Sequence, residues 1–143
     1  MIGVLLVTHG RLAEELLAAA EKIAGALPHF GALSLEWSDG LEEARRRITE
    51  GVRRLDAGEG VLVLTDMFGD TPSNAALALW QPGKVEIISG VNLPMVVRLA
   101  CSRSSRLPLT ELARWLEVKG RRSIRRAGAV ERGPLPGEGT NGG

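Results

Sequence analysis

Three predicted loops carry side chains that could take part in a reaction. His9 follows an apolar run at residues 2–7, Asp66 follows an apolar run at 61–65, and a polar segment at 89–92 follows a later run. An imidazole needs a second group to fix its tautomer, and a carboxylate at a neighbouring strand end commonly does this. If the first two runs are adjacent strands, one ring nitrogen of His9 binds Asp66 and the other keeps a lone pair. The pattern therefore indicates a histidine nucleophile, although a polar strand-end histidine beside a helix-capping aspartate fits the same positions.

Two predicted helix starts beside these loops could bind an anion such as a phosphoryl group. Helix N-termini present free N–H groups and the positive end of the helix dipole. Gly10 precedes one such helix, and Gly69 and Thr71 precede another that begins with Pro72. Their N–H groups and the Thr71 hydroxyl would stabilise a phosphoryl group on His9, but glycine and Thr-Pro are equally common at helix starts for structural reasons. No GxxxxGK[ST] segment is present, so we expect no bound nucleotide and no cofactor.

The composition narrows the class of protein. The 143 residues are 44% hydrophobic with three Trp, two Phe and no Tyr, which predicts one domain with an aliphatic core. A net charge of +1 argues against a dedicated nucleic-acid binder. The single cysteine, Cys101, excludes an internal disulfide and a cysteine-based zinc site. Because no apolar run approaches the roughly 18 residues that span a bilayer, we expect a cytoplasmic domain without membrane insertion.

Apolar runs alternate with helical patterns along the chain, which is typical of an open, mostly parallel α/β sheet with helices on both faces. Runs without polar alternation suit strands that are buried on both faces. The expected strands are 2–7, 33–37, 61–65 and 84–89, with a short C-terminal edge strand at 121–126. The expected helices are 12–27, 41–55, 71–79, 92–102 and 108–120. Ligands collect at the carboxyl ends of such strands, so the loops at 8–11, 37–40, 65–71 and 89–92 should converge.

Local signals predict two helix caps and one domain boundary. Asp39 with Glu42 resembles a capping box at the second helix, and Thr71 is a candidate cap for the third. Residues 1–126 should form the domain, and the Gly/Pro-rich stretch 127–143 is expected to be a disordered tail.

Three segments together resemble the mannose-family IIA component of the bacterial phosphoenolpyruvate-dependent sugar phosphotransferase system. They are GVLLVTHGRLAEELL, VLVLTDMFGDTPSNAALAL and VEIISGVNLPMVVRL, and the similarity covers residues 2 to about 125. The resemblance implies a homodimer whose C-terminal edge strand can be exchanged, and a phosphohistidine cycle. In that cycle the phosphocarrier protein HPr donates a phosphoryl group, and a separate IIB component receives it for sugar uptake.

The resemblance also assigns roles to residues. By motif, the phosphorylated histidine is His9 and the orienting aspartate is Asp66. The residues expected to surround the phosphoryl group are Gly10, Gly69, Thr71, Ser89 and Asn92. HPr-type partners usually dock through apolar contacts ringed by charge, and the loop-borne apolar residues near the expected site are Met67, Phe68 and Met95. A minor role in the core is the alternative for these three.

Asp70 departs from the family pattern, in which a second glycine is common at this position. A carboxylate that points inward would repel a dianionic phosphoryl group, so the phosphohistidine would be less stable and transfer from it faster. A carboxylate that points outward would change little.

Other functions remain open on the same residues. A IIA-like domain without a fused IIB could signal through its phosphorylation state or supply a kinase with phosphate. An apolar strand ending in His9-Gly10 also resembles tetrapyrrole chelatases, where histidine binds metal. The only other histidine, His29, lies in a helix-terminating loop, so we expect no metal site. The basic excess in residues 98–132 could bind an acidic partner or form a solvated edge.

Overall fold

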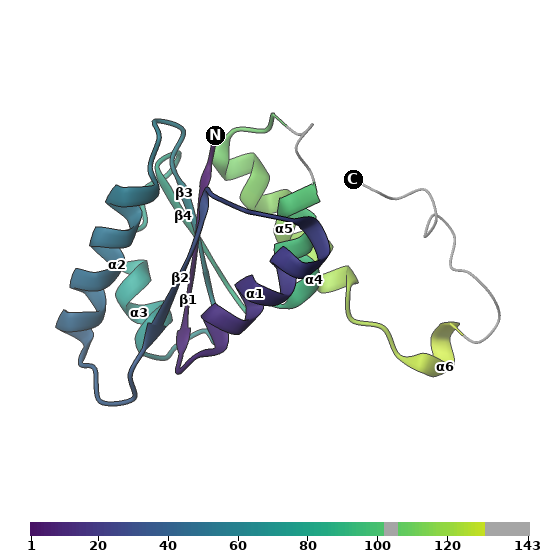
Figure 1. Cartoon of the computed structure of the whole chain (residues 1–143), viewed down its shortest axis with the longest axis horizontal. Coiled ribbons are helices and arrows are strands. Elements are labelled where there is room, and N and C mark those ends of the chain that lie inside the picture. The colour runs from purple at the N-terminus through teal and green to yellow at the C-terminus, as the bar shows by residue number, and fades with distance from the viewer. Residues whose placement is uncertain (102–105, 131–143) are drawn as a thin grey trace.

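A four-stranded parallel sheet lies between two layers of helices in the computed structural model, which describes residues 1–101 and 106–130 (Figure 1). The strands are β1 (Gly3–His9), β2 (Phe30–Leu35), β3 (Val61–Thr65) and β4 (Val85–Ser89). The helices are α1 (Leu12–Ala24), α2 (Leu41–Leu55), α3 (Thr71–Leu77), α4 (Leu93–Cys101), α5 (Leu109–Arg122) and α6 (Ala127–Val130). The predicted α/β class and the parallel arrangement are confirmed.

The core lies on both faces of the sheet because successive side chains of a strand point to opposite faces. Val4 and Leu6 of β1 pack into the cluster that contains α1, α4 and α5, whereas Leu5 and Val7 pack into the cluster that contains α2 and α3. None of these four side chains is more than 2% exposed. The absence of polar alternation in β1 therefore reflects burial on both faces.

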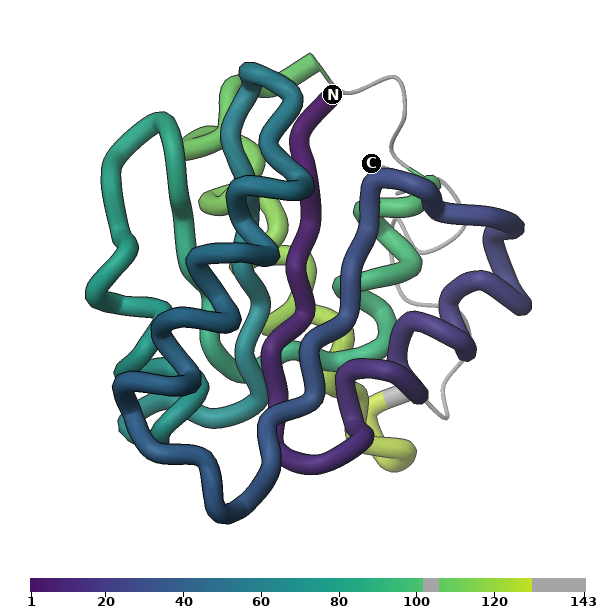
Figure 2. Tube along the Cα trace, turned by 60° about the vertical axis from the view of Figure 1, so that its left-hand side comes forward, coloured from purple at the N-terminus to yellow at the C-terminus, as the bar shows by residue number. Residues whose placement is uncertain are grey.

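The strand order is β2-β1-β3-β4. β2 therefore lies on one side of β1, and the chain then crosses over so that β3 lies on the other side of β1. Figure 2 shows β1, in purple, with β2 in blue beside it. On its other side β1 pairs with β3, with Val7 opposite Thr65. His9 and Asp66 follow these two residues at the carboxyl edge of the sheet. This reversal of strand order is where open α/β sheets place their ligands.

The edge strand expected at residues 121–126 is not observed. Helix α5 continues through Arg122, the side chain of Arg121 binds Glu117 one turn earlier at 2.8 Å, and the Ser123 hydroxyl donates to the Gly120 carbonyl at 2.6 Å. These contacts lie within α5 and at its end, and they need no neighbouring strand. They continue the helix into residues that we expected to form a β-strand.

Two expected helix caps differ in detail. The carboxylate of Asp39 accepts the backbone N–H of Glu36 and binds Arg47, and α2 begins after Gly40 without a side-chain cap. The predicted capping box is therefore wrong. Asp70, rather than Thr71, caps α3.

Several helix and strand boundaries also differ from those expected. Helix α1 ends at Ala24 before Gly25, β2 begins three residues earlier than expected, and α3 ends at Leu77. Helix α6 falls within the stretch expected to be disordered, and the rest of that stretch, 131–143, lies outside the described residues.

Candidate functional site

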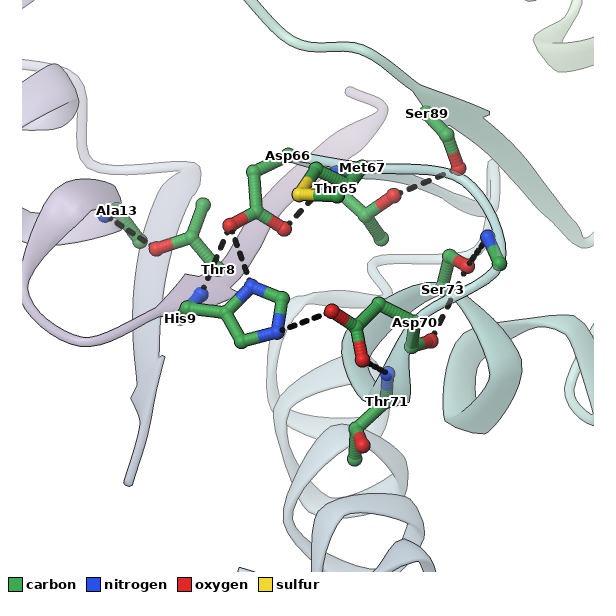
Figure 3. Close-up of polar contacts among 11 residues, drawn as sticks. Thr8, His9, Ala13, Thr65, Asp66, Met67, Asp70, Thr71, Ser73 and Ser89 are labelled. Atoms are coloured by element: carbon green, nitrogen blue, oxygen red, sulfur yellow. Dashed lines mark hydrogen bonds and ion pairs between the residues drawn. The ribbon is translucent and has the colours of Figure 1, made fainter. Parts of the chain in front are cut away.

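The carboxylate of Asp66 holds His9 at the end of β1. Its Oδ2 lies 2.8 Å from His9 Nδ1 and also accepts the His9 backbone N–H at 3.0 Å (Figure 3). Its Oδ1 accepts the backbone N–H of Met67 at 3.0 Å. A carboxylate acceptor beside Nδ1 places the proton of a neutral imidazole on that nitrogen and leaves the lone pair on Nε2. The structure thus brings the two predicted residues together, with Asp66 at Nδ1 and with Nε2 on the side of the ring away from Asp66.

Burial and hydrogen bonding act in opposite directions on Asp66. The side chains of His9 and Asp66 are 13% and 11% exposed. Burial raises the pKa of the Asp66 carboxyl, but hydrogen bonds from His9 and Met67 outweigh it, so the pKa lies below its usual value. Asp66 is therefore an anion at neutral pH, and it can stabilise positive charge that develops on the imidazole.

The turn after His9 is fixed by a buried hydroxyl and a glycine. Thr8 is fully buried, and its Oγ1 accepts the backbone N–H of Ala13 at 2.6 Å, which satisfies a donor in the first turn of α1. Gly10 has a φ of +54°, a conformation that glycine adopts without strain, and its N–H donates to Leu35 at 2.9 Å. The chain therefore turns sharply after His9 and leaves the ring at the edge of the sheet.

A second carboxylate faces the other ring nitrogen. Oδ2 of Asp70 lies 3.1 Å from His9 Nε2, and its Oδ1 accepts the backbone N–H of Thr71 at 2.8 Å (Figure 3). The Asp70 side chain is 49% exposed, far more than that of Asp66. Of the two orientations that the sequence left open for Asp70, the structure has the inward one.

Trp37 covers one face of the His9 ring. The two rings are stacked with centroids 4.8 Å apart and an angle of 24° between their planes, although Trp37 is 79% exposed. Its loop is held by Asp39, which binds Arg47 at 3.1 Å. Sequence reasoning placed the 37–40 loop near the site but did not select Trp37. Trp37 lies two residues after Leu35, which pairs with His9, so its approach to the ring depends on a register that the sequence does not give.

Residues 3–114 match the EIIA-man family, described as the fructose IIA component of the phosphotransferase system (PTS). The chain belongs to this family. The mannose-specific EIIAB component of the PTS from Escherichia coli K12 is 31% identical over 125 residues, which cover 87% of this chain and 39% of that protein. The chain thus spans 39% of the length of this curated relative.

Two further relatives are closer to this chain in length. The sorbose-specific EIIA component of the PTS from Lacticaseibacillus casei is 29% identical over 105 residues, covering 71% of this chain and 74% of the relative. The solved structure of the mannose/sorbose-specific IIA subunit from Enterococcus faecalis superposes with a TM-score of 0.77 at 30% identity. That superposition covers 94% of this chain and 96% of the other, so the fold is shared over nearly the whole length.

In this EIIA-man chain, the backbone donors expected around a phosphoryl group already have partners. The N–H of Gly69 donates to the Ser73 hydroxyl at 2.7 Å, and the N–H of Thr71 is bound to Asp70. Like the N–H of Gly10, they are engaged within the protein in this state, so a phosphoryl group on His9 would have to replace these contacts or bind beside them.

Ser89 and Asn92 make structural contacts. The Ser89 hydroxyl accepts from Thr65 at 2.7 Å and lies beyond Thr65 as seen from His9 (Figure 3). The Oδ1 of Asn92 accepts the backbone N–H of Met95 at 3.1 Å in the first turn of α4. These contacts tie β4 to β3 and fix the start of α4, and they do not involve the His9 ring.

The three apolar docking candidates separate into two groups. Met67 and Phe68 are 56% and 76% exposed in the loop that follows Asp66. Met95 is only 3% exposed, and it packs so closely on Gly120 that a Cβ there would lie 2.7 Å from its sulfur. The docking role predicted for Met95 is therefore wrong, because this residue belongs to the contact between α4 and α5.

Two structural features bear on the other classes of function. Within residues 1–101 and 106–130, no three His, Cys, Asp or Glu side chains are grouped so that they could bind a metal ion. Over the same residues, each helix is too short or too polar to cross a bilayer.

We expect Asp66→Asn to lower the free energy of unfolding at neutral pH by about 1–3 kcal/mol, because hydrogen bonds to a charged carboxylate lose strength. The folded pKa of Asp66 is lowered, so its contribution is present above the unfolded pKa of about 3.9 and is lost as the pH falls through the folded pKa. Urea unfolding at pH 7 and pH 3 should show a smaller acid-induced loss in the variant. Glu36→Gln, which removes an exposed carboxylate at the same edge of the sheet, is the control. If wild type and Asp66→Asn lose the same free energy of unfolding between pH 7 and pH 3, the stabilising role of the Asp66 carboxylate is contradicted.

Proposed function

We propose that this EIIA-man chain carries a phosphoryl group on Nε2 of His9. The observation that supports this most strongly is the 2.8 Å contact between Asp66 Oδ2 and His9 Nδ1. It gives Nδ1 a hydrogen-bond acceptor, so Nε2 can act as the nucleophile at the edge of the sheet once Asp70 has turned away from it. The family match supports the same class of chemistry, because PTS IIA components belong to a sugar phosphotransferase system.

The transfer step follows from this geometry. The Nε2 lone pair attacks the phosphorus of phospho-HPr, the P–N bond of the donor breaks, and its electron pair returns to the donor imidazole. Positive charge develops on the His9 ring as the new bond forms, and the Asp66 carboxylate 2.8 Å from Nδ1 stabilises it. Such transfers need positioning and electrostatic stabilisation more than covalent help from the protein.

We propose that the phosphoryl group then passes to a separate IIB component, in the cytoplasm. The name of the Escherichia coli relative, a mannose-specific EIIAB component, supports this order because it combines a IIA and a IIB unit in one chain. The aligned residues of this chain correspond to only 39% of that relative. The step to IIB is the reverse of loading, with Nε2 of His9 as the leaving nitrogen.

Incubation with enzyme I, HPr and labelled phosphoenolpyruvate tests the carrier function. We expect an acid-labile, base-stable label on the wild-type chain, none on His9→Ala, and full label on His29→Gln, which replaces the only other histidine. Asp66→Asn should load about 10- to 100-fold more slowly, the rate equivalent of losing a charge-assisted hydrogen bond. Label that persists in His9→Ala would exclude His9 as the carrier, and an unchanged rate in Asp66→Asn would remove Asp66 from the mechanism.

Met67 and Phe68 supply the docking surface in this proposal. They are exposed apolar side chains in the loop that begins at Asp66, so a partner that reaches His9 also reaches them. Buried apolar contacts of this size commonly dominate the energy of an interface.

The double variant Met67→Ser, Phe68→Ser should raise the KM for phospho-HPr by about tenfold and leave kcat within about twofold, because it removes binding area without touching His9. Ile23→Ser is the control, since Ile23 is also an exposed apolar residue, 61% exposed, but on α1. An unchanged KM would show that these residues do not contact the donor.

We also propose that the chain is a homodimer, with a second copy covering the outer edge of β4. This strand is at the edge of the sheet, and beyond the Gln81–Val85 bridge no described segment pairs with its outer side. A groove beside it has the apolar side chains of Ile87, Ile88 and Ile124 in its lining, with Phe68 and the charged Glu117 and Arg121 also along it, and Ile124 is 81% exposed. Open strand edges with adjacent apolar groups are common sites of pairing between chains.

Ile124→Asp should shift the chain from dimer to monomer, because it replaces a highly exposed apolar side chain of the groove with a charge. Sedimentation velocity over a range of protein concentrations measures the change. Ile23→Asp introduces the same charge on α1 and should leave the dimer intact. A wild-type chain that sediments as a monomer at all concentrations would refute the dimer.

A further inference from the structure

The carboxylate of Asp70 occupies the approach to the nitrogen that the proposed function requires. Its Oδ2 lies 3.1 Å from Nε2 of His9. The orientation is fixed by the start of α3, since Oδ1 accepts the Thr71 N–H at 2.8 Å and the Asp70 carbonyl accepts the Asn74 N–H at 2.8 Å. In this orientation the carboxylate both caps α3 and contacts the ring.

The His9 ring is also held where it is. Asp66 binds Nδ1, and Trp37 stacks on one face of the ring at 4.8 Å. The ring is 13% exposed, whereas the Asp70 side chain is 49% exposed. The carboxylate can therefore turn into solvent, but the ring has contacts that oppose its rotation away from Asp70.

We propose that Asp70 competes with the phosphoryl group for Nε2 and raises the phosphoryl-transfer potential of His9. This inference rests on the proposed function. In the unphosphorylated chain, the contact is attractive only while Nε2 carries a proton, and a protonated Nε2 has no lone pair for attack. Without that proton, the carboxylate oxygen faces the lone pair and blocks the line along which phosphorus must approach. In both forms, Asp70 must turn away before His9 is loaded.

The same carboxylate acts on the phosphorylated chain. The phosphoryl oxygens on Nε2 would fill the space that Oδ2 now occupies, and two like charges a few ångströms apart repel one another strongly in a partly desolvated site. Asp70 forms no bond to phosphorus. Its charge raises the free energy of phospho-His9, which shifts the equilibrium toward the donor and speeds loss of the phosphoryl group to IIB or water.

Two substitutions separate the charge of Asp70 from its role at α3. Asp70→Ser keeps a favourable N-cap but removes both the charge and the reach to Nε2, and Asp70→Asn removes the charge with little change of shape. Glu36→Gln is the matched control, because it removes one exposed carboxylate from the neighbouring loop.

The fraction of phosphorylated chain is measured at equilibrium with fixed ratios of phospho-HPr to HPr, followed by hydrolysis after the donors are removed. We expect Asp70→Ser to shift the equilibrium toward phospho-His9 by about 10- to 100-fold and to slow hydrolysis, the range that one adjacent like charge produces. Asp70→Asn should shift it in the same direction, and Glu36→Gln should stay within about twofold of wild type. Equal constants for wild type and Asp70→Ser would overturn the proposal.

A second measurement needs no phosphoryl donor. Nitrogen-15 NMR of the histidine rings in the unphosphorylated chain should show a changed Nε2 signal of His9 in Asp70→Ser, with the bond between Nδ1 and Asp66 retained. An unchanged Nε2 signal would refute the contact in solution. If the wild-type chain takes no label on His9 at all, the carrier function fails and the inference about transfer fails with it. If the wild-type chain is labelled normally and Asp70→Ser has no effect, the role of Asp70 is refuted and the carrier function of His9 stands.

Discussion

The hydrogen bond between Asp66 and His9 depends on the strand order of the sheet. Because the chain returns from β2 across β1, strand β3 is the direct neighbour of β1, and their ends meet. If the strands followed the order β1-β2-β3, β2 would lie between β1 and β3. The backbones that carry His9 and Asp66 would then be about 9–10 Å apart, twice the spacing of adjacent strands. One carboxylate then binds the His9 ring, the His9 N–H and the Met67 N–H. The backbone orients Asp66, and Asp66 orients the ring.

The parts of the fold that the sequence predicts are those that depend on local burial. β1 and β3 are continuous apolar runs, and strands buried on both faces have no other pattern. His9 and Asp66 could be found because they are the first reactive side chains after those runs. The rule that parallel strands end at one edge placed both residues at that edge, but their contact also required β3 to be the neighbour of β1, which the sequence left as a condition.

The predictions that failed depend on contacts between distant segments or on competing local contacts. Met95 follows a loop in sequence, but α5 places Gly120 against it and makes it part of the core. Residues 121–126 were expected to form an edge strand, yet one-turn contacts such as that of Arg121 with Glu117 extend α5 into this stretch. Trp37 was missed because its stacking on His9 depends on the pairing of β1 with β2, which the sequence does not reveal.

In the proposed phosphoryl cycle, Asp66 and Asp70 would have opposite effects on one imidazole according to the nitrogen that each faces. In that proposal Asp66 faces the nitrogen that would keep its proton, so its negative charge would be favourable whenever the ring becomes positive. Asp70 faces the nitrogen whose bond changes, so its charge opposes the incoming phosphoryl dianion. Their exposures fit these roles, at 11% for Asp66 and 49% for Asp70. Because Asp70 is exposed, its charge is partly screened by water and it can turn away, so in the proposed cycle it would adjust the stability of the carried group. Serine, asparagine, aspartate and glycine are all favourable at the start of a helix. A substitution among them at position 70 would therefore change the transfer potential of His9 without disturbing the sheet that holds His9.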